Sequence, residues 1–213
     1  MRALPVLVGV AAVVAVVLLL TARHPRADAR LLKQAGFVVS AVFTLIGGAF
    51  IVGDAFADPG GWAALGLVTA WAVPLIALAA VSWFRPDLAT RLLGVLTTVA
   101  VGLSVWFALD PQGWRTVEND IGPIRAVAVY VLAAAVAVLG LRRTAVAGVM
   151  LLVLGVVPVV VSSLGSRGGI PSLAAASLAP VVSGVLYLLS ARVARGAGSP
   201  DVEASGDRRP HAA

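Results

Sequence analysis

The stretch Val13-Val14-Ala15-Val16-Val17-Leu18-Leu19-Leu20 decides the fold class of this chain. Every residue in it is apolar, whereas a strand of a membrane β-barrel alternates polar and apolar positions. Backbone N–H and C=O groups find no water in the bilayer core, so a continuous apolar run there forms a helix. The run therefore predicts an all-α membrane protein.

Composition extends this prediction to the whole chain. Of the 213 residues, 60% are hydrophobic and only 12% are charged, which is about half the charged fraction of a soluble domain. So few charges cannot cover so much apolar surface in water, and the solvent is therefore predicted to be lipid. The chain has no cysteine, which excludes disulfides, thiolate metal sites and cysteine nucleophiles.

The apolar residues fall into seven stretches, each of about 18–22 residues and able to cross a hydrocarbon core of about 30 Å as a helix. No Asp, Glu, Lys, Arg or His lies deep inside any of them. The predicted spans are Leu4–Ala22, Ala35–Asp54, Ala63–Phe84, Leu92–Leu109, Ile124–Leu141, Thr144–Ser163 and Ile170–Ser190. Residues 1–195 then form a seven-helix transmembrane domain, and residues 196–213 form a disordered cytoplasmic tail.

The first span has an alternative interpretation as a cleaved signal peptide. Arg2 precedes it, and Ala27-Asp28-Ala29 resembles a cleavage site. Its apolar run, however, is longer than the usual 7–15 residues, and Arg23 and Arg26 lie before the supposed cut. We therefore expect a retained helix.

Basic residues predict the orientation. When the loops are assigned alternately to the two sides of the membrane, twelve of the sixteen Lys and Arg residues fall on one side and four on the other. This predicts a bacterial plasma-membrane protein with its N-terminus outside and its C-terminus in the cytoplasm. The net charge of +6 then divides into about +7 on the cytoplasmic side and about −1 outside, and it indicates no nucleic acid. Arg23–Lys33 and the pair Arg192/Arg195 are expected to attract anionic lipid head groups there.

A pentapeptide recurs on the predicted outer side. Asp58-Pro59-Gly60-Gly61-Trp62 follows the second span, and Asp110-Pro111-Gln112-Gly113-Trp114 follows the fourth. As structural turns, they would use Asp as a cap, Pro and Gly for the reversal, and Trp at the lipid–water interface. As functional elements, they would form a matched pair around an outer pocket. The structural interpretation is favoured.

The second of these loops also carries Glu118, Asp120 and Arg125. Paired carboxylates bind cations or transfer protons only when burial or close approach shifts their pKa values, so a solvated loop with local ion pairs is favoured. The candidate outer-face binding residues are Asp58, Trp62, Asp110, Trp114, Glu118, Asp120 and Arg125.

Two features of the spans concern packing and bending. Small residues recur every fourth position at Gly36, Ser40, Thr44 and Gly48, and again at Gly94, Thr98 and Gly102. Such seams let helices approach closely, within one chain, with a membrane-protein partner or in a homo-oligomer. Pro74, Pro158 and Pro180 lie inside spans, and bent helices of this kind build the midplane sites of some transporters.

Absent residue types narrow the function further. Proton pumps and voltage sensors need ionisable side chains at depth, and haem ligation needs a residue such as His within a span. Both histidines, His24 and His211, lie in polar segments, and the only Lys is Lys33. We therefore predict no catalytic residues, no cofactor and no metal. The leading hypothesis is a non-enzymatic accessory, scaffold or regulatory subunit, and the alternative is a passive or weakly coupled transporter of neutral or lipophilic solutes.

The strings Gly53-Asp54-Ala55-Phe56-Ala57-Asp58-Pro59-Gly60-Gly61-Trp62 and Asp110-Pro111-Gln112-Gly113-Trp114-Arg115 resemble those of uncharacterised multi-pass membrane proteins of high-GC actinobacteria. The resemblance covers most of the membrane domain. It implies a polytopic helical fold in the plasma membrane and carries no activity, substrate or site residue.

Overall fold

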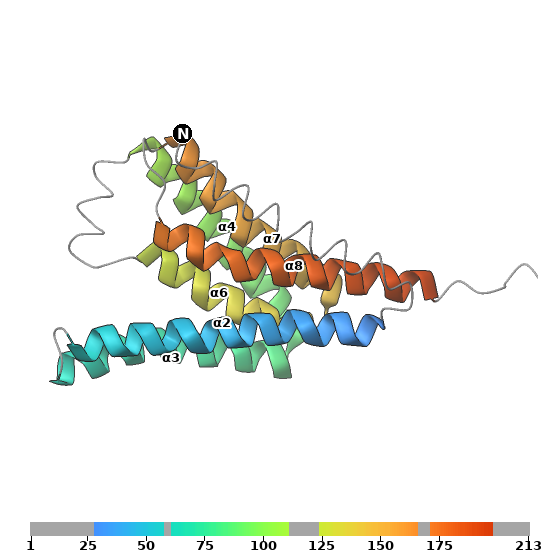
Figure 1. The fold of residues 1–213 in the computed structure, drawn as a ribbon, viewed down its shortest axis with the longest axis horizontal. Coiled ribbons are helices and arrows are strands. Elements are labelled where there is room, and N and C mark those ends of the chain that lie inside the picture. The colour runs from blue at the N-terminus through green and yellow to red at the C-terminus, as the bar shows by residue number, and fades with distance from the viewer. Residues whose placement is uncertain (1–27, 58–60, 111–123, 166–170, 198–213) are drawn as a thin grey trace, which may run out of the picture.

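The computed structural model describes residues 28–57, 61–110, 124–165 and 171–197. These ranges form helices throughout, apart from short connections (Figure 1). The helices are α2 (Ala29–Ala57), α3 (Gly61–Phe84), α4 (Pro86–Leu109), α6 (Ile124–Gly140), α7 (Thr144–Gly165) and α8 (Pro171–Ala197). The predicted first span, Leu4–Ala22, lies outside the described residues, as does the predicted tail from residue 198 onward.

Five of these helices contain a segment long and apolar enough to cross a membrane: α2, α3, α4, α7 and α8. The apolar part of α6, Val127–Gly140, is shorter. The described residues therefore confirm the predicted all-helical fold, which is compatible with a multi-pass membrane protein. The total of seven spans and the orientation remain predictions.

Several helices extend beyond their predicted spans, and local chemistry explains where they begin. The second helix begins at Ala29 instead of Ala35, because the Asp28 carboxylate accepts a hydrogen bond from the Arg30 amide at 2.9 Å. The fourth begins at Pro86 instead of Leu92, with the proline in the first turn, where its missing N–H costs no helical hydrogen bond. Arg85 alone separates α3 from α4.

The last helix corrects the predicted tail boundary. It continues through Ala197, so the first two residues of the predicted tail, 196 and 197, are helical. The exposed Arg195 side chain donates from Nε to the Ala191 carbonyl of the preceding turn at 3.3 Å. A helix satisfies its own backbone hydrogen bonds, so it can continue past the end of its apolar segment.

The core lies where α6, α7 and α8 meet, and α6 contacts every other described helix. Val136 and Leu139 of α6, Leu151 and Leu154 of α7 and Tyr187 of α8 are fully buried there. In Figure 1, α2 and α3 lie on one side of α6 and α4 and α7 on the other, and α8 contacts both α2 and α7. The described helices therefore pack around α6.

Glycines set the closest helix contacts. A Cβ on Gly184 of α8 would lie 3.0 Å from the Gly148 carbonyl oxygen of α7, and one on Gly155 would lie 3.0 Å from the Ser177 carbonyl oxygen. At such distances a side chain would force the neighbouring backbone to shift, so glycine at these positions allows α7 and α8 to approach closely.

The structure confirms the first predicted small-residue seam. Gly36 faces Ser183 and Tyr187 of α8, and the Ser40 hydroxyl donates to the Ser183 hydroxyl at 2.8 Å. The second predicted seam is confirmed only at Gly94, where an added Cβ would lie 3.5 Å from the Met150 side chain of α7. A Cβ on Gly102 would meet nothing within 4 Å, and Thr98 is exposed and donates to the Gly94 carbonyl of its own helix.

The three prolines inside spans do not interrupt their helices. Pro74, Pro158 and Pro180 lie within the continuous helices α3, α7 and α8. Pro158 and Pro180 are fully buried, whereas Pro74 is exposed. The described helices therefore do not contain the unwound segments that build the binding sites of many transporters.

Candidate functional site

The structure describes only part of the predicted outer-face site. Trp62 lies in the first turn of α3 and is 88% exposed, as expected of an aromatic residue at a lipid–water interface. Asp110 follows the last residue of α4 and is exposed. Arg125 lies in the first turn of α6, but its side chain is outside the described set. Asp58, Trp114, Glu118 and Asp120 lie outside the described residues, so their proposed pairing stays a prediction.

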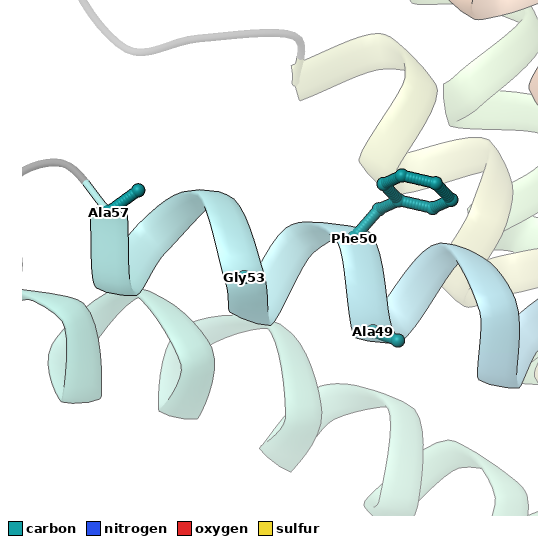
Figure 2. A pocket seen from close by; sticks show the side chains of 4 residues that line it. All are labelled: Ala49, Phe50, Gly53 and Ala57. Carbon is teal, nitrogen blue, oxygen red and sulfur yellow. The ribbon is translucent and has the colours of Figure 1, made fainter.

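A hollow of about 460 Å³ lies along the last turns of α2, at the same end of the bundle as Trp62. Figure 2 shows its four lining residues, Ala49, Phe50, Gly53 and Ala57. All four are exposed, and none carries a polar side chain. This hollow therefore provides apolar surface for acyl chains and no group for catalysis.

A different pocket, of about 510 Å³, lies at the opposite end of α2. It is formed where the beginning of α2 meets the end of α8, both on the right in Figure 1, together with the end of α3 and the α6–α7 turn. We call it the basic pocket. Its lining residues are Ala29, Arg30, Lys33, Gln34, Trp83, Leu141, Arg142, Thr144, Ser190, Ala191 and Ala194.

Two of the cations in the basic pocket are held by contacts across the fold. The Arg142 guanidinium carbon lies 4.7 Å from the centroid of the Trp83 ring, a cation–π contact. The Lys33 ammonium lies 3.5 Å from the Leu141 carbonyl oxygen, just beyond the end of α6. These contacts fix the direction of each side chain and leave most of its N–H donors available to a ligand.

The hydroxyl groups in the wall of the pocket hold the backbone. The Ser190 hydroxyl donates to the Ala29 carbonyl at 2.6 Å and ties the end of α8 to the first turn of α2. The Thr144 hydroxyl donates to the Gly140 carbonyl at 3.1 Å, across the α6–α7 turn. These two hydrogen bonds therefore position the walls of the pocket without involving its three cationic side chains, Arg30, Lys33 and Arg142.

Among the described residues, no carboxylate lines the basic pocket. The nearby Asp87 is paired with Arg143 in a partly exposed ion pair, and the Asp28 side chain accepts from the Arg30 backbone. Arg30, Lys33 and Arg142 thus give the pocket a concentrated positive charge. Such a concentration of positive charge attracts anions electrostatically.

The sequence predicted part of this site. It placed Arg30 and Lys33 in a basic segment that meets lipid head groups, but it did not bring Arg142 and Trp83 to the same place. Arg192 and Arg195, the other predicted lipid-binding pair, are exposed on the last turns of α8 and do not line the pocket. The signal available in the sequence was that all these residues follow or precede apolar spans on one predicted side of the membrane.

The described ranges hold no group of three or more His, Cys, Asp or Glu residues that could bind a metal ion. No protein-family model, no curated protein and no solved structure matches this chain. The resemblance carried by the two Asp-Pro-x-Gly-Trp strings therefore stays a prediction. Inferences about the function of this chain therefore rest on its fold and on the basic pocket.

Proposed function

We propose that this chain is a non-enzymatic integral membrane protein that acts as an accessory, scaffold or regulatory subunit. In this proposal it spans a bacterial plasma membrane seven times, with its N-terminus outside and its C-terminus in the cytoplasm. The observation that most directly supports this proposal is the uneven burial of the apolar helices. Only 6% of the apolar segment of α3 is buried among the described residues, against 56% of that of α8.

A peripheral helix of this kind supports a lateral contact with another membrane protein or a second copy of the chain. Large side chains such as Leu67 and Ile76 project from α3, at 52% and 64% exposure. Helices associate in lipid through side-chain packing, so a helix with little packing inside its own bundle retains surface for a partner.

The interior of the described bundle supports this proposal over the transport alternative. The cavity between Ser40, Tyr130 and Pro180 measures only about 10 Å³, close to the minimum volume for a single water molecule. The Tyr130 hydroxyl closes it by donating to the backbone carbonyls of Phe43 and Thr44. Transport of a solute would require α2, α6 and α8 to separate at this point.

Site-specific photo-crosslinking in native membranes tests the proposal. A photoreactive residue at Ile76 of α3 should give one discrete adduct with a membrane protein or a second copy. The matched control is Val149 of α7, which is also exposed, at 54%, and should react only with lipid. If Ile76 also reacts only with lipid, the subunit role fails. A specific solute flux in reconstituted vesicles, abolished by Pro180→Ala, would favour transport instead.

A further inference from the structure

We propose that the basic pocket is a binding site for the phosphate group of an anionic phospholipid. Three cations from two separate parts of the chain, Arg30 and Lys33 of α2 and Arg142 of the α6–α7 turn, line this one cavity of about 510 Å³. The pocket could bind such a lipid with or without a protein partner, so the inference goes beyond the proposed subunit role.

The donor set fits phosphate chemistry. A guanidinium presents a planar fork of N–H donors that pairs with two phosphate oxygens, and an ammonium adds a compact point charge. Arg142 is already oriented by Trp83, and Lys33 by the Leu141 carbonyl. Side chains that are ordered before binding lose less conformational entropy when the ligand arrives.

The surroundings of the pocket favour a lipid over a soluble phosphate. Trp83 and Phe84 end the apolar segment of α3 and are 45% and 76% exposed. An exposed tryptophan at the end of a span is typical of the interfacial region, where head groups lie. The lipid-facing surface of α3 therefore runs directly into the wall of the pocket, so a head group can enter while its acyl chains remain in the bilayer.

The test measures lipid binding to the full-length protein by native mass spectrometry in detergent, with phosphatidylglycerol and phosphatidylcholine as probes. The pocket variant combines Arg30→Gln, Lys33→Gln and Arg142→Gln. The matched control combines Arg85→Gln, Arg91→Gln and Arg143→Gln, three exposed cations that do not line the pocket. A charge-preserving variant, Arg30→Lys with Lys33→Arg and Arg142→Lys, shows whether charge at these positions is sufficient. Circular dichroism and thermal unfolding of each variant verify the fold.

We expect the wild type to bind phosphatidylglycerol in preference to phosphatidylcholine. The pocket variant should bind phosphatidylglycerol about a hundredfold more weakly, from three lost charges of about 1 kcal/mol each. The control should lose less than about fivefold, and the charge-preserving variant should retain most of the affinity. Equal losses in the pocket and control variants would mean diffuse surface attraction and would overturn the site.

A competition arm separates the lipid from free phosphate. Inorganic phosphate at millimolar concentration should not displace phosphatidylglycerol, because it has no acyl chains to contact the surface beside Trp83. Displacement by inorganic phosphate, or its retention by the wild type but not by the pocket variant, would replace the lipid with a soluble phosphate ligand. These outcomes do not depend on the crosslinking of α3, so the inference and the subunit role can fail separately.

Discussion

The hydroxyl of Tyr187 on α8 donates a 2.7 Å hydrogen bond to the carbonyl oxygen of Ala137 on α6. This carbonyl lies in the last turn of α6, where the Leu141 amide bonds to Val138 instead. The tyrosine therefore satisfies a buried acceptor that the helix leaves open at its end. Gly140 makes this possible, because a Cβ at that position would overlap the Tyr187 ring.

Tyr187→Phe should destabilise the protein by about 1–3 kcal/mol, because the ring packing remains but the Ala137 carbonyl loses its partner in a buried site. The matched control is Tyr130→Phe. Its hydroxyl donates to Phe43 and Thr44, whose carbonyls lie inside α2 and accept helical hydrogen bonds as well. Reversible unfolding in detergent should show the larger loss for Tyr187→Phe. Equal losses would mean that the end of α6 is satisfied in another way.

Gly184→Ala should separate α7 from α8 and lower the free energy of unfolding by about 1–3 kcal/mol. Its new Cβ would lie 3.0 Å from the Gly148 carbonyl oxygen and 3.1 Å from the Leu152 amide nitrogen, and backbone atoms cannot rotate away as a flexible side chain can. Gly102→Ala is the control, because its Cβ would meet nothing within 4 Å. Thermal unfolding of the two variants in the same detergent measures the difference. A neutral result at Gly184 would contradict the close approach of the two helices.

How well the sequence predicts a feature of the fold depends on whether that feature is determined by nearby residues or by contacts with other helices. Apolar length alone predicted the helices, but it missed the first turn of α2, which depends on the Asp28 cap and on the Ser190 contact to Ala29. The two small-residue seams have the same spacing, yet Gly36, Ser40 and Gly48 of the first face neighbouring helices, whereas Thr98 and Gly102 of the second do not. Spacing identifies a face of a helix and does not determine what lies against it.

The candidate site shows the same distinction. The alternation of basic loops placed Lys33 and Arg142 on one predicted side of the membrane, which required only their order along the chain. Their presence in one pocket depends on how α2 packs beside the α6–α7 turn, and Lys33 contacts Leu141 across 108 positions of sequence. No local pattern in the sequence encodes that contact.

Asp87→Asn should change stability by less than about 1 kcal/mol, and the effect should shrink further at high salt. Asp87 pairs with Arg143, but their side chains are 78% and 43% exposed, so solvent screens the interaction. Thermal unfolding at low and at high ionic strength measures the effect. A large, salt-independent loss would show that this ion pair fixes the α6–α7 turn, and it would also require a revised view of how Arg142 is positioned.

Cysteine labelling tests the predicted orientation, because the chain has no native cysteine. The 29 residues of α2 extend for about 44 Å, longer than a hydrocarbon core of about 30 Å. Ala57 and Ala29, at its two ends, should therefore label from opposite sides. Single cysteines at Ala57, Thr116 and Ser166 should react with an impermeant reagent added outside intact cells, and those at Ala29 and Ala204 only after permeabilisation. Reversed labelling would place the basic pocket in the outer leaflet, and labelling of both Ala29 and Ala57 from outside would mean that α2 does not cross the membrane.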